Sequence, residues 1–220
     1  MRSTYRDTNT HSNTIGGATL ADGNIVKDNF VVPNGTTFQD DGIRLEPRVC
    51  TTTVQSNTVS GSSLEGIAVF ADAWDSKVLN NVVEANGNHP LLTQRKGDGI
   101  RVFLRAQRTI VTANTVCGSG GSGISVDTAV NSAGVVTYPL TGQGSTIQNN
   151  KSGIGTPAEP CARNAVGPDL PTRPAYDLLE GGHTAVTGAA EACRHTWSGN
   201  SAGLDVLGVA SAFPTCTTQP

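Results

Sequence analysis

The sequence predicts an all-β solenoid, a parallel β-helix made of short strands. The first observation is a repeat in which a Gly before an apolar residue is followed by Asn fifteen residues later, as from Gly42 to Asn57, Gly66 to Asn81 and Gly99 to Asn114. The second is the alternation of Ile and Val in short runs bounded by Gly, Asn, Ser and Thr, which is typical of strands and turns. The Gly-to-Gly steps, 24 residues from 42 to 66 and 33 from 66 to 99, fall in the range of repeat architectures.

The Gly-Ile half of the repeat predicts one strand in each coil. Its apolar, variable, apolar pattern recurs in Ile43-Arg44-Leu45, Ile67-Ala68-Val69, Ile100-Arg101-Val102 and Ile124-Ser125-Val126. Side chains alternate between the two faces of a strand, so the first and third positions should point into the coil and the second outward. We therefore expect the four Ile residues to stack inside the solenoid.

The Asn half predicts a tight turn between two further strands. An apolar residue lies three positions before each Asn and another two positions after it, giving Val26/Val31, Val54/Val59, Val78/Val83 and Val111/Val116. Degenerate copies surround Asn150, with Ile147 and Ser152, and Asn200, with Trp197 and Ala202. Asn tolerates left-handed backbone geometry, and in register such residues should form a ladder with rungs about 4.8 Å apart.

The spacing predicts a single β-helix domain, 1–220, of about six coils. Regular coils should span 14–152, beginning with a weaker copy at Thr14-Ile15; an irregular excursion, a last coil and a C-terminal cap should fill 153–220. Trp197 should plug the end of the core. The repeat is already running at Ile15 with no cap before it, which favours a trimmed N-terminus.

The bulk composition excludes two classes of partner. A net charge of −3 provides no basic field for nucleic acid. No apolar stretch reaches the roughly 18 residues that a membrane span requires, and residues 1–14 lack the apolar core of a signal peptide. The oligomeric state is left open.

The chain has five cysteines, Cys50, Cys117, Cys161, Cys193 and Cys216, without the spacing of a zinc site. A disulfide between Cys161 and Cys193 would tie down the C-terminal part, the alternative being a set of buried thiols. The odd count leaves at least one cysteine outside any intrachain pair.

Carboxylates precede three of the Gly-Ile strands, namely Asp41, Glu65 and Asp98, and Ser122 precedes the fourth. Stacked one coil apart, two such charges repel by about 1 kcal/mol in water and about 3–4 kcal/mol at an effective dielectric of 20, so this acid column requires a cation or a proton. The outward positions beside it are Arg44, Ala68, Arg101 and Ser125, followed by Glu46, Phe70, Phe103 and Asp127. A loop over 82–98 with His89, Arg95 and Lys96 should adjoin this face, and long loops on rigid scaffolds commonly carry function.

Over roughly residues 14–202 the repeated GIxV and VxxNxV units resemble the right-handed parallel β-helix proteins of the pectin-lyase-like superfamily. Within it, QDDGI at 39–43 and GDGI at 97–100 resemble the acid motifs of polygalacturonases, which implies acid and base roles for Asp40, Asp41 and Asp98. Ser122 stands where that family has His, and its Arg-Ile-Lys motif has no counterpart. Resemblance to the lyases instead implies Ca²⁺ held by Asp41, Glu65 and Asp98, with Arg101 or Arg44 and Lys96 as base.

The sequence therefore predicts a secreted or cell-surface enzyme, a lyase or hydrolase, that acts on an acidic polysaccharide. Catalysis would rest on Asp98, Asp41, Asp40 and Arg101, and substrate binding on Glu65, Arg44, Phe70, Phe103, His89, Arg95 and Lys96. The alternative is a non-catalytic carbohydrate-binding, adhesin-like or surface module. In that case Asp41 and Asp98 only form turns, and Arg44 and Arg101 pair with them in a solvated ladder.

Overall fold

The structure, a computed structural model, describes residues 24–32, 40–88, 96–103, 105–127, 144–154, 161–162, 164, 167–170, 173–175, 177–180, 195–203 and 211–212. Every regular element in these ranges is a β-strand. Nowhere in them does a helix occur that is long and apolar enough to cross a membrane. The predicted first copy at Thr14-Ile15 and the loop residues His89 and Arg95 lie outside the described ranges.

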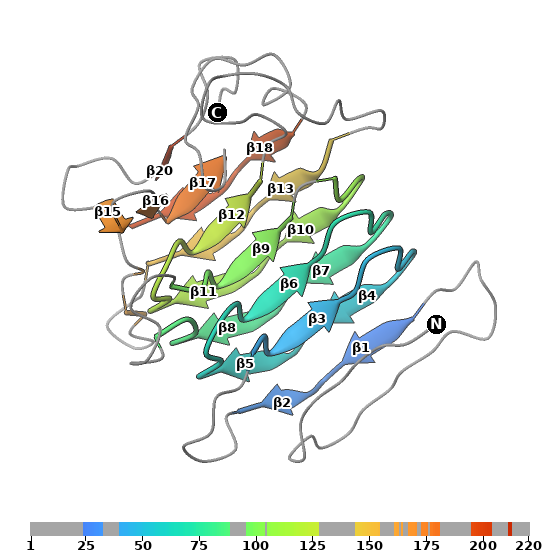
Figure 1. The fold of residues 1–220 in the computed structure, drawn as a ribbon, viewed down its shortest axis with the longest axis horizontal. Coiled ribbons are helices and arrows are strands. Elements are labelled where there is room, and N and C mark those ends of the chain that lie inside the picture. Colours follow the sequence, from blue (N-terminus) through green and yellow to red (C-terminus); the bar gives the residue numbers. More distant parts are fainter. Residues whose placement is uncertain are drawn as a thin grey trace.

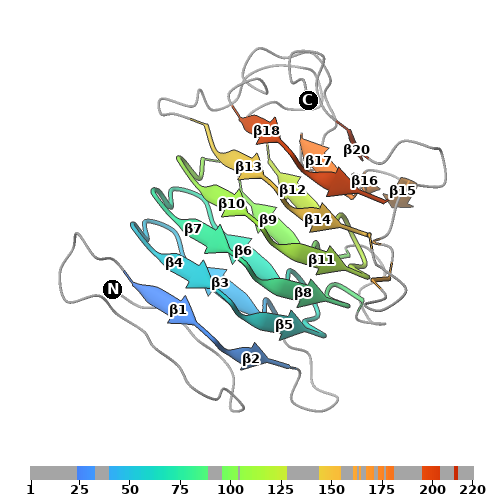
Figure 2. The same cartoon turned by 180° about the vertical axis from the view of Figure 1, so that it is seen from behind.

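Three parallel sheets, each of six short strands, make up most of the described structure (Figures 1 and 2). A separate two-stranded antiparallel sheet joins β15 (Gly167–Leu170) to β16 (Arg173–Ala175). Sheet A contains β1 (Ile25–Lys27), β4 (Thr53–Gln55), β7 (Lys77–Leu79), β10 (Ile110–Thr112), β13 (Thr146–Gln148) and β18 (Thr196–Ser198). Sheet B contains β2 (Phe30–Val31), β5 (Thr58–Ser60), β8 (Val82–Glu84), β11 (Thr115–Cys117), β14 (Lys151–Ser152) and β19 (Ser201–Ala202). Sheet C contains β3 (Ile43–Leu45), β6 (Ile67–Val69), β9 (Ile100–Val102), β12 (Ile124–Val126), β17 (Leu178–Glu180) and β20 (Ser211–Ala212). This all-β arrangement of parallel stacks is compatible with a parallel β-helix.

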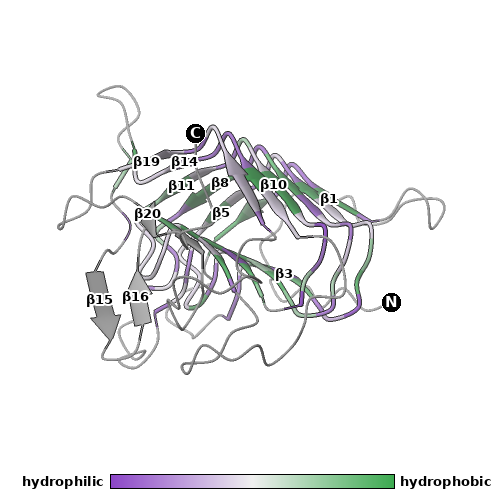
Figure 3. Ribbon diagram, turned by 90° about the horizontal axis from the view of Figure 1, so that it is seen from above, coloured by the Kyte–Doolittle hydropathy of each residue, from purple (hydrophilic) through white to green (hydrophobic). Residues whose placement is uncertain are grey.

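One hydrophobic core runs between the three sheets, as the view from above shows (Figure 3). In sheet C the predicted stack is confirmed: Ile43, Ile67, Ile100 and Ile124 pair in register, and Leu178 of β17 continues the row. In sheet A, Ile147 of β13 pairs with Trp197 of β18, which is buried within the core. Trp197 is thus a structural residue, as its position in the repeat predicts.

The Gly before each Ile is required by packing. A Cβ atom on Gly66 would lie 2.5 Å from a methyl group of Val83 and 2.7 Å from the carbonyl oxygen of Gly99. Real side chains do not tolerate such contacts, and the backbone atom cannot move away. The close approach of sheet C to the Val side chains of sheet B therefore explains why the repeat contains Gly at this point.

The predicted Asn ladder is confirmed, and it is continuous. Each side-chain amide donates to the Oδ1 atom of the Asn in the next coil, through Asn29, Asn57, Asn81, Asn114, Asn150 and Asn200, at 2.8–2.9 Å. Each Oδ1 from Asn57 onward also accepts from the backbone N–H of the preceding rung. All six side chains are buried, so the ladder satisfies polar groups that would otherwise destabilise the turn.

The turn between sheets C and A is a feature that the sequence pattern does not reveal. It joins β3 to β4, β6 to β7 and β9 to β10, and its copies lie one above another (Figure 1). Positive φ angles occur here at non-Gly residues, 62° at Asp72 and 69° at Arg105 among them. Asp is a common turn residue but Arg is not, so the copies of this corner at Arg48, Asp72 and Arg105 share no residue signal that would reveal it in the sequence.

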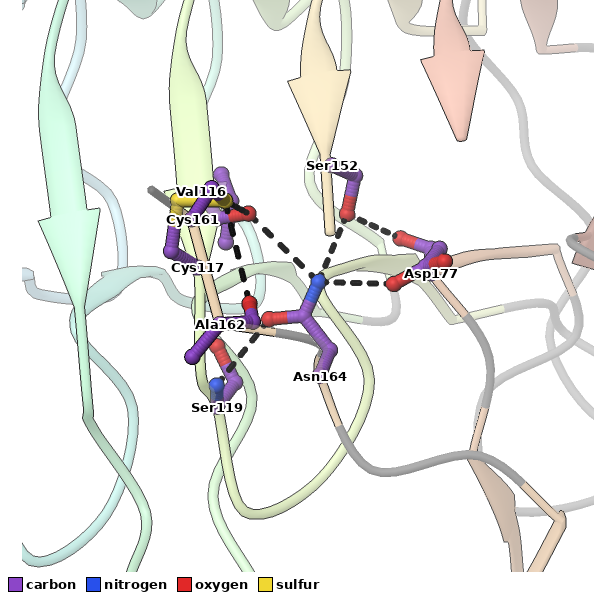
Figure 4. The surroundings of a disulfide bond; sticks show 8 residues. All are labelled: Val116, Cys117, Ser119, Ser152, Cys161, Ala162, Asn164 and Asp177. Atoms are coloured by element: carbon purple, nitrogen blue, oxygen red, sulfur yellow. Dashed lines mark hydrogen bonds between the residues drawn. A yellow bond between two sulfur atoms is a disulfide. The ribbon is translucent and has the colours of Figure 1, made fainter. Parts of the chain in front are cut away.

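The disulfide joins Cys117 to Cys161, so the predicted Cys161–Cys193 pair is wrong (Figure 4). It bridges 44 residues with the two Cα atoms 5.2 Å apart, and it brings Ala162 beside β11, where the Gly118 N–H donates to the Ala162 carbonyl. Asn164 then bonds Ser119, Ser152 and Asp177. The disulfide thereby returns the chain to register after the Pro-rich excursion, a long-range effect that cysteine spacing does not encode.

Candidate functional site

The outer face of sheet C is buried at β6, β9 and β12, unlike that of sheet A. All three residues of β6, β9 and β12 are buried, whereas only the central residue of β4 and β10 is. The outward positions Ala68, Arg101 and Ser125 are therefore enclosed and do not face solvent. Charged groups on this face lie in a low-dielectric environment, where partners and protonation decide their state.

The acid column lies on consecutive strands of sheet C. Asp41, Glu65 and Asp98 each come two residues before the Ile residues that pair in register in β3, β6 and β9. The backbone N–H of Glu65 donates to Asp41 Oδ1 at 3.2 Å, which places the two acids side by side. All three are at least nine-tenths buried.

Arg101 supplies the positive charge that the column requires. Its Nη1 donates to Glu65 Oε1 at 3.0 Å, while its Nε and Nη2 donate to the two carboxylate oxygens of Asp127 at 3.2 and 2.9 Å. Desolvation lowers the pKa of Arg101, but the charges of Asp127, Asp98 and Glu65 raise it more, so the guanidinium remains charged. A permanently protonated group with three engaged donors cannot accept a proton.

Asp98 is held by the turn that follows it in the next coil. Its Oδ1 accepts from the Ser122 backbone N–H at 2.7 Å and its Oδ2 from the Ser125 hydroxyl at 2.5 Å. Ser125, expected to face solvent, is fully buried by this contact. These bonds are those of a turn-forming carboxylate, the alternative that the sequence left open for this residue.

Asp41 is the acid of this column whose pKa is raised by its surroundings. Burial, together with a hydrogen bond to Glu65 and the charge of Glu65, raises the pKa of the Asp41 carboxyl to about 8, against the lowering effect of Arg44. Arg44 Nη1 lies 3.6 Å from Asp41 Oδ2, and its side chain is 31% exposed. The Asp41 and Glu65 carboxyl groups are thus buried side by side, close to a partly exposed cation.

The two Phe side chains beside the column stack on each other with ring centroids 4.2 Å apart. The Arg44 guanidinium lies 3.8 Å from the Phe70 centroid and that of Arg101 lies 4.1 Å from the Phe103 centroid. Both faces of each ring are therefore occupied, in the order Arg44, Phe70, Phe103, Arg101. Neither ring has a free face for a sugar.

The remaining predicted residues divide into two groups. Asp40 is exposed at the edge of the site, and Lys96 is half-buried shortly before Asp98. His89 and Arg95 lie outside the described residues. Within the described ranges, no group of three or more His, Cys, Asp or Glu side chains is arranged to hold a metal ion, so Ca²⁺ binding by Asp41, Glu65 and Asp98 has no geometric support there.

Asp127 is the member of the site that the sequence-based list of functional residues omitted. It lies one residue past β12, at the outward position that Glu46, Phe70 and Phe103 occupy in earlier coils, and its side chain is 11% exposed. The sequence could have revealed Asp127, because an acid in this outward row one coil beyond Arg101 lies within reach of the Arg101 guanidinium.

No protein-family model matches this chain, and comparisons with curated proteins and with solved structures give no match.

Proposed function

We propose that the chain is a right-handed parallel β-helix of about six coils, related to the pectin-lyase-like superfamily, that hydrolyses an acidic glycan at the Asp41 end of the acid column. The observation that carries this proposal is the raised pKa of the buried Asp41 carboxyl, which lies beside Glu65 and adjacent to Arg44. A carboxylic acid that keeps its proton at neutral pH suits the role of general acid.

In this reaction the Asp41 carboxyl, whose side chain is 1% exposed in the free protein, has to become accessible to the glycosidic oxygen of the leaving sugar, to which it donates its proton. Asp40, the exposed neighbouring carboxylate, takes a proton from the water that attacks the anomeric carbon. Glu65, fixed by Arg101, holds the Asp41 carboxyl in place, and Arg44 binds a carboxylate of the substrate. Hydrolysis is favoured over elimination because Arg101, the base that a lyase would use, is engaged by Glu65 and Asp127.

The Cys117–Cys161 disulfide supports an extracellular location, because disulfides form and persist in oxidising compartments. A glycan substrate would also be present in the medium or at the cell surface, where a secreted or cell-surface protein is located.

The test is a panel of pectate, alginate and glycosaminoglycans, scored for new reducing ends and for the ultraviolet absorbance of unsaturated uronates. We expect reducing ends without unsaturated products, and we expect Asp41→Asn to abolish release while the protein stays folded. Unsaturated products would identify a lyase instead. Asp40→Asn, in which only an exposed carboxylate is changed, should lower the rate without affecting the melting temperature.

A second candidate is a non-catalytic carbohydrate-binding or surface module. It is favoured by the mutual satisfaction of Arg101, Asp127, Asp98 and Ser125, which is what a purely structural wall would show. Inactivity of the wild-type protein on the whole panel, together with unchanged glycan binding in Asp41→Asn, would decide for this candidate.

A further inference from the structure

Trp74 is an exposed aromatic residue on a different edge of the molecule, the turn between β6 and β7. Its side chain is 38% exposed, and Phe30 and Val82 are the other large hydrophobic residues exposed to this degree among the described ones. Its backbone is fixed by bridges to Cys50 in the coil before and Gln107 in the coil after. The indole therefore sits on a rigid support although it belongs to a turn.

The indole of Trp74 is unoccupied, in contrast to the rings of the acid wall. Phe70 and Phe103 have both faces covered, whereas within the described ranges Trp74 has no stacking ring, no cation and no hydrogen-bond partner for its N–H. The side-chain amide of Gln107, one coil further along, likewise has no hydrogen-bond partner in this part of the chain. A buried or interface Trp normally finds a partner for its N–H.

Two ion pairs across adjacent coils flank this indole. Arg105 Nη2 lies 2.8 Å from Asp72 Oδ2, and Arg108 bonds both carboxylate oxygens of Asp75 at 2.6 and 2.7 Å. All four side chains are about 40% exposed, so part of each ion pair faces solvent. Planar carboxylate and guanidinium groups in this position can bond the hydroxyls of a sugar whose ring rests on the indole.

We infer that Trp74, Gln107 and the two flanking ion pairs form a platform that binds an uncharged sugar ring of a glycan. The flat apolar area is about one pyranose ring in size, while a stable protein interface needs about 800 Å² per partner with more aromatic and apolar residues. The two Asp and two Arg charges cancel in pairs, so the platform offers no net attraction for a charged sugar. This inference is independent of the proposed hydrolysis, because it involves none of the residues of the acid column.

The experiment is calorimetric titration of the full chain with cello-, xylo-, manno- and galacto-hexasaccharides, with hexagalacturonate as the charged comparison. We expect saturable binding of at least one neutral hexasaccharide and weaker binding of hexagalacturonate. Trp74→Ala should weaken that binding about tenfold or more, and Gln107→Ala several-fold. Because the chain has two Trp residues and Trp197 is buried, binding should also shift the fluorescence of the wild type but not that of Trp74→Phe.

Phe30→Ala is the control, since Phe30 is 52% exposed on β2 of sheet B and takes no part in the platform. It should bind as the wild type does, and all variants should retain the wild-type circular dichroism. The inference is overturned by a lack of response to every neutral probe, by a preference for hexagalacturonate, or by full binding in Trp74→Ala. Concentration-dependent self-association that Trp74→Ala removes would also overturn it, because a second copy would then be the occupant.

Discussion

Replacing Asp41 by Asn should remove one pH-dependent contribution to the stability of this protein. In the native state Asp41 keeps its proton up to a pKa of about 8, whereas in the unfolded chain it loses that proton near the ordinary value of about 4. Between these two values the native state binds more protons than the unfolded state. The contribution of Asp41 to the free energy of unfolding therefore falls as pH rises through this window and levels off above about pH 8.

The magnitude follows from the proton difference. One proton corresponds to about 1.4 kcal/mol per pH unit, so the wild type should lose roughly 2–3 kcal/mol relative to Asp41→Asn between about pH 5 and about pH 7. For a domain of this size that is about 5–10 °C in melting temperature. Asn mimics the protonated acid: its carbonyl can accept from the Glu65 N–H, and its amide can donate to the Glu65 side chain.

The assay is chemical and thermal unfolding of the wild type, Asp41→Asn and Asp40→Asn at both pH values. Asp40→Asn is the control because Asp40 is exposed. As pH rises, the free energy of unfolding of Asp41→Asn should increase relative to that of the wild type. The free energy of unfolding of Asp40→Asn should show the same pH dependence as the wild type. If wild type and Asp41→Asn show the same pH dependence, Asp41 is ionised in the native protein, and its role as proton donor fails with it.

Other perturbations test the scaffold. Asn114→Ala removes a central rung that makes five hydrogen bonds and should cost about 3–5 kcal/mol in urea unfolding, whereas Asn29→Ala at the end of the ladder should cost clearly less. Cys161→Ser opens a 44-residue loop and should lower the free energy of unfolding by about 4 kcal/mol, a loss that reduction of the wild type should reproduce. Ser125→Asp would bury a second carboxylate against Asp98 and should unfold the domain as Ile100→Asp does; a near-native melting curve would contradict the buried site.

The stacked strands and the Asn ladder were predictable because both are local patterns repeated in register. Ile100 and Asn114 occupy positions whose spacing recurs in every coil, so one correct alignment places all their counterparts. Burial within the coil then follows from the period of two along a strand.

The burial of the outer face of sheet C was not predictable from that pattern. Ser125 and Arg101 alternate with apolar residues as solvent-facing positions do, and only their tertiary surroundings enclose them. The same holds for Cys117, whose partner depends on where the chain returns after the excursion. Ion pairing of Arg101 with Asp127 lay within reach of the sequence, since both positions belong to the outward rows beside the acid column.

The Asn ladder also keeps the same hydrogen-bond geometry whatever the length of chain between its rungs. Asn57 and Asn81 are 24 residues apart and Asn150 and Asn200 are 50 apart, yet the bonds that join them measure 2.9 and 2.8 Å. Foreign peptides or whole domains could therefore be grafted between rungs without moving the core. Over evolutionary time the same tolerance lets such a protein acquire new surface loops by insertion, while the Asn ladder keeps the coils in register.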